Sequence, residues 1–268
     1  MDIGFYDYSG GFMKLDCHMH INGAGLMWGW DHNDRIIDAA DRLGIDQLCV
    51  SIPMMRGMPS MAQVRACNDA VLDAMERYAG RILGYCYVVP GYVESLAEID
   101  RCLEAGMIGI KLYNQYKLWD PTVHPTIEKA IKENVPILEH AGYSTTPQYW
   151  QEKPNMSHAG DFVRAAELYP EAMFIEAHIG GGGDWEWCIK QLRHASSVYL
   201  DTSGSVIDEG MVEMAARELG AERLLFGTDM TMEGGVAKIT GASLSKRQKE
   251  QIFWRNFRGI LERRRASC

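Results

Sequence analysis

Two histidines, His18 and His20, stand two positions apart in the run KLDCHMH. Side chains of a β-strand alternate between its two faces, so both imidazoles point to the same face if this run is a strand, with Asp16 on that face one layer deeper. Cys17 and Met19 are then expected to face the helices. Two adjacent imidazoles are costly to bury unless their nitrogens are used, and a divalent metal is the usual partner. The pair therefore predicts a metal site.

Three further residues that can bind a metal or carry a proton also follow apolar runs. His140 ends the run PILEH, His178 ends AMFIEAH and Asp229 ends LLFGTD. In a barrel of parallel strands the active site is built at the carboxyl ends of the strands. The sequence thus predicts that these side chains converge with the first pair. The remaining histidines fall in predicted loops or helices, where solvated or packed side chains are expected: His32, His124, His158 and His194.

The elements that must position these residues alternate between short apolar runs and longer stretches of helical period, a pattern typical of βα units and a parallel sheet. The predicted strands end near His20, Pro53, Val89, Tyr113, His140, His178, Thr202 and Asp229. The predicted helices span residues 32–43, 60–79, 92–105, 122–133, 158–168, 184–195, 207–219 and 245–263. This predicts an α/β fold, a single-domain (β/α)₈ TIM barrel over residues 1–268, with a short N-terminal extension at 1–12 and a C-terminal helix within 245–268.

Composition and motifs exclude several other classes. A doubly wound open sheet is the alternative fold, but neither GxGxxG nor GxxxxGK[ST] occurs. The chain is 47% hydrophobic and 24% charged, as in a globular domain, and its net charge of −9 disfavours nucleic acid and anionic membranes as partners. Its first twenty residues lack the basic and apolar regions of a secretory signal, and no run of apolar residues reaches membrane-spanning length, so we expect a soluble protein that is not exported. Its seven cysteines form no CxxC pair, so we expect free thiols in a cytoplasmic protein.

The motifs at the strand ends resemble those of the metal-dependent amidohydrolase superfamily, in particular its amidohydrolase-related group (amidohydrolase 2). In the family's order they are DCHMH at 16–20, GIKL at 109–112, LEHAG at 138–142, AHIGG at 177–181 and LFGTD at 225–229, which covers nearly the whole chain. The resemblance implies that His18, His20 and His140 are metal ligands. Asp229 would be a fourth ligand or a catalytic acid/base. His178 would bind a second metal or orient the attacking water.

Lys111, at the end of the predicted fourth strand, leaves several interpretations open. In two-metal members of the superfamily a lysine at this place is carbamylated and bridges the ions, whereas many one-metal members do without it. It can instead provide a cation for an anionic substrate, or form a buried salt bridge with Glu176 or Asp16. The implied set of imidazoles and one carboxylate suits Zn²⁺, with Mn²⁺ as the alternative, and one ion is favoured over two.

The resemblance implies a hydrolase that uses a metal-activated water on an amide, lactone or ester bond of a small, carboxylate-bearing substrate. Asp229 would accept the proton of the water, and Asp229 or His178 would return it to the leaving group. The same group resembles nonhydrolytic decarboxylases of aromatic or unsaturated carboxylates, which is the alternative reaction. Those decarboxylases tend to be longer, so the compact chain favours hydrolysis. A catalytically inactive ligand-binding barrel is the alternative of another class.

Four residues are predicted to contact the substrate. Trp28 and Trp30 lie in the glycine-rich segment after the first predicted strand, where they form a lid or a flat wall, or else pack on a neighbouring helix or subunit. Arg56 and Tyr113 follow the second and fourth predicted strands and can reach a substrate carboxylate or ring hydroxyl.

The remaining expectations concern supporting residues and partners. Asp201 and Ser203, at the end of the seventh predicted strand, are candidate hydrogen-bond partners of the histidines. The long connection at 142–157 is expected to be a lid or an oligomer contact. The basic run at 246–265 is expected to be a solvated helix face. A small-molecule substrate is the expected partner, and a homodimer is the commonest closed assembly for such a chain.

Overall fold

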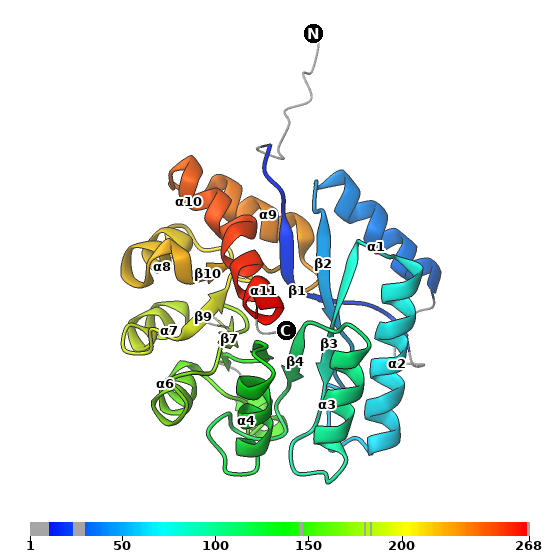
Figure 1. The fold of residues 1–268 in the computed structure, drawn as a ribbon. Coiled ribbons are helices and arrows are strands. Elements are labelled where there is room, and N and C mark those ends of the chain that lie inside the picture. The colour runs from blue at the N-terminus through cyan, green and yellow to red at the C-terminus, as the bar shows by residue number, and fades with distance from the viewer. Residues whose placement is uncertain (1–10, 24–29, 145–146, 180, 183, 267–268) are drawn as a thin grey trace.

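A computed structural model describes residues 11–23, 30–144, 147–179, 181–182 and 184–266 of the chain. Eight parallel strands form one sheet in chain order and curl into a barrel with the helices outside it (Figure 1). The barrel strands are β1 (Leu15–His20), β2 (Gln47–Ser51), β3 (Ile82–Tyr87), β4 (Gly109–Leu112), β5 (Ile137–Glu139), β7 (Phe174–Glu176), β9 (Val198–Asp201) and β10 (Leu224–Leu225). The predicted single-domain (β/α)₈ barrel is confirmed.

Helices follow the strands and surround the barrel (Figure 1). Those that match predicted helices are α1 (Trp30–Arg42), α2 (Met61–Arg77), α3 (Ser95–Glu104), α4 (His124–Lys132), α6 (Ala159–Leu168), α7 (Trp185–Leu192) and α8 (Met211–Leu219). The predicted C-terminal helix consists of α10 (Lys246–Glu250), a π-helical turn (Gln251–Arg255) and α11 (Asn256–Ala266). Residues 1–10 and 267–268, part of the predicted extension and C-terminal helix, lie outside the described residues.

Two helices are absent from the sequence prediction. Helix α9 (Met232–Gly241) contains three glycines, which lower its intrinsic helix propensity and conceal it in the sequence. Helix α5 (Pro147–Glu152) and the short strand β6 (Tyr143–Ser144), which pairs with β8 (Gly181–Gly182), lie in the segment that was expected to be a long connection.

Strand β1 contains a bulge that changes which side chains face the barrel interior. Asp16 and Met19 pair with the two residues of β2 that flank Cys49, so Cys17 and His18 together oppose Cys49. A bulge of this kind breaks the alternation of side chains. Cys17 accordingly packs in the same interior cluster as Cys49. The predictions that Asp16 shares the face of His18 and that Cys17 faces the helices are therefore wrong.

The barrel closes where its first and last strands meet, and its two ends are built differently. At the junction of the first and last strands, the Cys17 N–H donates to Phe226 O at 2.8 Å and the Asp229 N–H donates to His18 O at 2.8 Å. One end is sealed by α11, whose Phe257 packs on the interior cluster and which crosses the middle of the barrel in Figure 1. The carboxyl ends of the strands are left to form a site.

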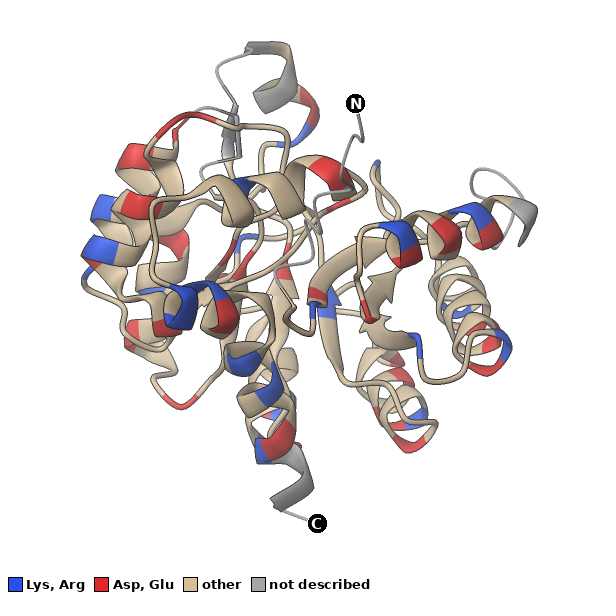
Figure 2. Cartoon of the chain, turned by 90° about the horizontal axis from the view of Figure 1, so that it is seen from above, with Lys and Arg blue, Asp and Glu red and all other residues tan. Residues whose placement is uncertain are grey.

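Charged residues of both signs alternate over the outer helices (Figure 2). In the basic C-terminal run, Arg255 pairs with Glu250 at 2.9 Å and Arg258 with Glu262 at 3.0 Å. Within the described part of the chain, no helix is both long and apolar enough to cross a bilayer. Free thiols are confirmed for the cysteines at 17, 49, 67, 86, 102 and 188, all of them buried.

The buried carboxyl group of Glu176, the last residue of β7, should make the stability of the fold depend on pH. Glu176 is 1% exposed, its Oε1 accepts a hydrogen bond from Cys188 Sγ at 3.4 Å, and its Oε2 has no hydrogen-bond partner among the described residues. Burial raises the pKa of Glu176 to about 8. The folded state thus holds a proton that the unfolded chain loses above its ordinary pKa, so this stabilisation is complete below about pH 4.5 and is lost as the pH rises through about 8.

Replacing Glu176 with glutamine should remove that pH dependence. From pH 5 to pH 8 the free energy of unfolding of the wild type should fall by about 3 kcal/mol relative to Glu176→Gln. Urea denaturation at both pH values measures this difference. The matched control is Glu186→Gln, a 56% exposed glutamate on α7. A wild-type-minus-variant difference that is the same at both pH values would show that Glu176 titrates normally.

Candidate active site

The carboxyl end of the barrel holds a pocket of about 790 Å³. The predicted site residues that line it are His20, Arg56, Tyr113, His140 and Asp229. Three others are buried beside these lining residues: His18, Lys111 and His178. The structure therefore brings together side chains of β1 and β4 and of the segments that follow β2, β4, β5, β7 and β10, as the rule for barrel strand ends predicts.

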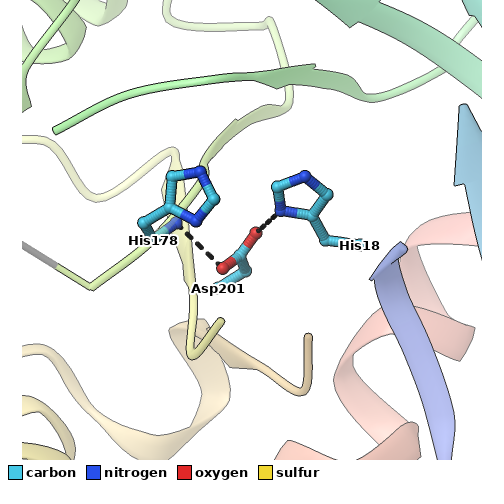
Figure 3. Close-up of side chains that lie close together, drawn as sticks. All are labelled: His18, His178 and Asp201. Atoms are coloured by element: carbon cyan, nitrogen blue, oxygen red, sulfur yellow. Dashed lines mark hydrogen bonds and ion pairs between the residues drawn. The ribbon is translucent and has the colours of Figure 1, made fainter. Parts of the chain in front are cut away.

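Asp201, at the end of β9, organises the buried part of the site. Its Oδ2 lies 2.8 Å from His18 Nδ1, and its Oδ1 accepts the backbone N–H of His178 at 2.9 Å (Figure 3). The backbone N–H and the hydroxyl of Ser203 also donate to Oδ1, at 2.9 and 2.5 Å. Although burial alone would raise it, the neighbouring His18 holds the pKa of Asp201 far below its usual range. The predicted contacts of Asp201 and Ser203 with the histidines are confirmed.

The bond to Asp201 fixes the proton on the His18 ring. A carboxylate can only accept, so Nδ1 carries the hydrogen and Nε2 presents its lone pair. Burial, together with the charge of Lys111, lowers the pKa of His18 to about 4. His18 is therefore a neutral imidazole at neutral pH, the form that binds metals.

Asp229 lies among three imidazoles. Its Oδ1 is 3.1 Å from His20 Nε2 and 3.8 Å from His18 Nε2, and its Oδ2 is 3.5 Å from His178 Nδ1. Burial would raise the pKa of Asp229, but His18 and His20 outweigh it and hold the pKa far below its ordinary value. The carboxylate is ionised, and both of its oxygens face ring nitrogens.

The contacts of His20 indicate that a cation belongs between it and Asp229. Its Nδ1 lies 2.9 Å from the backbone oxygen of Ser51, which can only accept, so Nδ1 carries the hydrogen. In the tautomer that has its only ring hydrogen on Nδ1, Nε2 presents a lone pair to Asp229 Oδ1, 3.1 Å away. Two acceptors at that distance need a proton or a metal ion between them. Ligand atoms of His18, His20 and Asp229 lie within 4.8 Å of one another, and such a set of imidazoles and a carboxylate suits a divalent metal.

His140 and His178 form a second pair. His178 Nε2 lies 3.0 Å from His140 Nδ1, and Tyr113 stacks on the His140 ring with centroids 4.3 Å apart. Burial lowers the pKa of both histidines, that of His140 well below its ordinary value. Two clusters of potential ligand atoms occur among the described residues, and His140 is in neither. Its assignment as the third ligand stays a prediction.

Lys111 contacts a histidine instead of a carboxylate. Its Nζ lies 3.2 Å from His18 Nε2, and within the described part of the chain it forms no ion pair with Glu176 or Asp16. The interpretation as a buried salt bridge to those residues is therefore wrong. Burial lowers the pKa of Lys111 to about 8, so the neutral amine is accessible near neutral pH.

Backbone strain is concentrated at the site. His178, Asp229 and Met230 have φ values of 66°, 45° and 72°, in the left-handed region that residues other than glycine rarely adopt. Such conformations persist where the surrounding structure enforces them, and they are common at functional sites. Here the two strained chain segments carry the imidazole of His178 and the carboxylate of Asp229.

The predicted substrate-binding residues differ in position. Tyr113 is buried at 6% exposure and lines the pocket, whereas Arg56 is at the rim, with its side chain 85% exposed and 3.8 Å from Glu152. Trp28 lies outside the described residues, and Trp30 begins α1, with its side chain also outside them.

A cation without an assigned role in the sequence analysis also lines the pocket. Lys153 follows α5, and its Nζ lies 3.4 Å from Tyr113 Oη and 5.3 Å from the centre of that ring. The sequence places it only in the connection at 142–157, expected to be a lid or an oligomer contact, because that segment has no periodicity that would assign a role to a single residue.

Replacing Asp201 with asparagine should weaken metal binding about 10- to 100-fold, because an amide can present its NH₂ to His18 and no longer fixes the ring proton on Nδ1. Competition with a chromogenic chelator, using Zn²⁺ as the probe, measures the change. Asp208→Asn, at an exposed aspartate that accepts a bond from Trp185, is the control. Equal Zn²⁺ affinity in Asp201→Asn and the wild type would refute the orienting role.

Together these features define a (β/α)₈ barrel with a histidine–carboxylate site at the carboxyl ends of its strands. The sequence model of the Amidohydrolase family matches residues 15–258, and the chain belongs to this family. A search of curated proteins finds no significant match.

Solved structures share the fold at low sequence identity. A 4-oxalomesaconate hydratase from Rhodopseudomonas palustris is 17% identical with a TM-score of 0.73, and the match covers 95% of this chain and 97% of that one. A 2,6-dihydroxybenzoate decarboxylase from Rhizobium is 17% identical with a TM-score of 0.70, covering 94% and 98%. A 5-carboxyvanillate decarboxylase from Novosphingobium aromaticivorans, complexed with manganese and a nitrobenzoic acid, is 16% identical with a TM-score of 0.71, covering 94% and 97%.

Proposed function

We propose that the protein is a metal-dependent hydrolase that cleaves a C–N or C–O bond of a small, carboxylate-bearing substrate. The observation that carries this proposal is the position of Asp229, whose two oxygens face His18 and His20 on one side and His178 on the other, at a pocket of about 790 Å³. Hydrolysis needs a base beside the cation, and an ionised carboxylate in this position can be that base.

His18, His20 and Asp229 would hold a single divalent ion. The competing cluster contains His18, His178 and Asp201, but the Asp201 carboxylate already accepts four hydrogen bonds and would have to give some of them up to bind a cation. In the first cluster, by contrast, the closest contact joins two acceptors. Zinc is the favoured ion, and the manganese-bound relative makes manganese the alternative.

A divalent cation at this site supplies Lewis-acid catalysis and lowers the pKa of a water molecule. The residues of the chain do the rest. Asp229 accepts a proton from the attacking water and delivers it to the leaving group. The Ser203 hydroxyl donates its hydrogen to Asp201, so His178 Nδ1 carries a hydrogen of its own, and from 3.5 Å it faces Asp229 Oδ2 and orients this carboxylate. Ser203 Oγ lies 3.0 Å from His178 Nδ1 and helps to fix the orientation of the ring.

The walls of the pocket favour a planar anion as substrate. Tyr113, stacked on His140, offers a flat surface, and methionine and isoleucine side chains cover much of the remainder. Lys153 is near the Tyr113 hydroxyl, where its ammonium group can pair with a substrate carboxylate. Lys111, deeper in the site, is a second cation within reach of an anionic group. Arg56 at the rim contributes to attraction of the anion from solution.

Replacing Lys153 with methionine should weaken binding of an aromatic dicarboxylate about tenfold, because a charge-assisted hydrogen bond is lost. Calorimetric titration with phthalate provides the measurement without requiring the natural substrate. Arg56→Met is the matched control and should change the affinity by less than about twofold, since that guanidinium is exposed. A Lys153→Met protein that binds phthalate as tightly as the wild type would exclude Lys153 from the carboxylate subsite.

The proposed reaction is tested with protein reconstituted with Zn²⁺ or Mn²⁺ and a panel of amides, esters and lactones of aromatic and unsaturated carboxylic acids in H₂¹⁸O. Hydrolysis places ¹⁸O in the product without release of CO₂. Uptake of ¹⁸O without bond cleavage would instead indicate a hydratase. Turnover no faster than that of the free metal ion over the whole panel would refute the hydrolase proposal.

Decarboxylation is the second candidate reaction. The stacked Tyr113 and His140 rings form a platform for an aromatic carboxylate, and two of the structural relatives are aromatic-acid decarboxylases. In that reaction the cation would hold the substrate carboxylate, and a protonated side chain would supply the proton that replaces CO₂. Stoichiometric release of CO₂ without ¹⁸O in the organic product identifies this outcome.

A further inference from the structure

Lys238, on the unpredicted helix α9, has no counterpart among the predicted site residues. It is 9% exposed, and its ammonium group donates to three successive backbone oxygens: Thr202 O at 3.1 Å, Ser203 O at 3.3 Å and Gly204 O at 2.6 Å. Such a buried lysine is costly unless all of its protons are used. The three carbonyls use them, so one side chain fixes three consecutive residues after β9.

The segment 202–204 that Lys238 holds packs against His178. Ser203 Oγ lies 3.0 Å from His178 Nδ1. Gly204 has a φ of 89°, and a Cβ added there would lie 3.4 Å from His178 Cβ and 3.6 Å from its Nδ1. Ser203 therefore contacts the His178 ring directly, and Gly204 lies beside the His178 side chain with no more than the space of a methyl group between them.

His178 needs such a support because its own backbone is strained. Its φ of 66° lies in the left-handed region, which is unfavourable for a residue that has a Cβ. The backbone N–H of His178 is bonded to Asp201 and its ring to Ser203, and both partners belong to the end of β9 and its connection. A shift of that connection would release His178 from the orientation in which it faces Asp229.

The approach of α9 to the strand ends depends on its glycines. A Cβ at Gly235 would lie 2.7 Å from Thr228 Cγ2, so only glycine allows the helix this close to the end of β10. The same feature that lowers the helix propensity of α9 brings Lys238 within reach of the β9 connection.

We propose that Lys238 is a positioning residue, which holds segment 202–204 in place so that Ser203 and Gly204 keep the His178 imidazole directed at Asp229. The proposal rests on the proposed function for the role of His178. The part that concerns the position of segment 202–204 rests on the observed contacts alone. Lys238 acts through the segment and does not itself contact the reacting groups.

The test compares Lys238→Met, which removes the donors but keeps a long side chain, with Lys249→Met. Lys249 donates to Thr240 O, at the end of the same helix, with a distance of 2.6 Å, so its variant loses a lysine–carbonyl bond on α9 without touching the β9 connection. Amide hydrogen exchange, read by mass spectrometry over peptides that contain 177–179 and 199–205, should become at least about tenfold faster in Lys238→Met and stay unchanged in Lys249→Met.

Kinetics on a substrate from the panel above provides the second readout. In Lys238→Met we expect kcat to fall about 10- to 100-fold with KM and Zn²⁺ content unchanged, whereas a merely structural role would lower the melting temperature and leave kcat per folded molecule as it was. Adding Ser203→Ala to Lys238→Met should cost less than about twofold more, because both changes act on the same contact. Lys238→Arg, which retains a cationic donor, should recover most of kcat.

Exchange rates at 177–179 and 199–205 that are equal in Lys238→Met and the wild type would overturn the proposal, as would equal kcat values or an equal loss in Lys249→Met. If Lys238→Met does not fold, Lys238→Gln, with a shorter side chain and fewer donors, is used in the same way. Faster exchange in a protein without hydrolytic activity would support the positioning role and count against the proposed function. The experiment therefore distinguishes a failure of the positioning proposal from a failure of the proposed function.

Discussion

Replacing Asp229 with asparagine should lower kcat by about 10³-fold while the barrel stays folded. Removal of a positioned general base costs typically about 10² to 10⁴ in rate, and the amide oxygen of asparagine is a far weaker base than a carboxylate. The fold should persist because the structural contact of residue 229 is the backbone N–H that donates to His18 O at 2.8 Å. Steady-state kinetics on the reconstituted protein and far-ultraviolet circular dichroism measure the two quantities.

The control for this variant is Asp208→Asn, whose carboxylate accepts a bond from Trp185 and lies outside both ligand clusters. It should retain kcat within about twofold. If Asp229→Asn kept the wild-type kcat, Asp229 could not be the proton acceptor, and the hydrolytic mechanism would lose its base.

The double substitution His18→Ala, His20→Ala should abolish stable metal binding, leaving less than about a tenth of an ion per chain after dialysis. These imidazoles are two of the three proposed ligands, and each ligand atom contributes strongly to the affinity of a site of this kind. The barrel should still fold, because residues at the carboxyl ends of the strands serve the site more than the stabilising layers. Elemental analysis and a thermal melt check both points.

Two histidines remote from the site provide the matched control. His124 contacts Trp119 O and stacks edge-on against Tyr169, and His194 lies in the turn after α7. The variant His124→Ala, His194→Ala should keep its full metal content. Retention of metal in the His18, His20 variant would show that the ion is bound elsewhere.

The fold, and most of the residues that make up the site, could be predicted from the sequence. His18, His20, His140, His178 and Asp229 each follow an apolar run, and in a parallel barrel the ends of such runs must meet. The spacing of the runs was enough to bring these five side chains to one end of the barrel. Tyr113 was placed at the pocket for the same reason.

Features that depend on exact backbone geometry were not accessible. The bulge that turns Cys17 inward leaves no mark in the sequence, so strict alternation gave the wrong face for Asp16. The contact of Lys111 with His18 Nε2, in place of a salt bridge, depends on side-chain packing across the barrel. Helix α9 is concealed by its glycines because tertiary packing overrides their low propensity.

The partners of His18 show most clearly what the sequence alone could not predict. Asp201 is 183 positions away in the chain, and the sequence supports no more than its candidacy as a hydrogen-bond partner. Only the geometry shows that it fixes the His18 ring and the His178 backbone together, and that His18 Nε2 then lies 3.2 Å from Lys111 Nζ and 3.8 Å from Asp229 Oδ1.

The central claim, that His18, His20 and Asp229 hold one divalent ion, is tested most directly by the metal content of the protein. Elemental mass spectrometry on protein purified without a histidine tag, before and after reconstitution with zinc or manganese, gives the number of ions per chain. One ion per chain is the predicted result. Two ions would contradict the single-ion site and make Lys111 a bridging ligand, and no ion after reconstitution would contradict the metal-dependent mechanism itself.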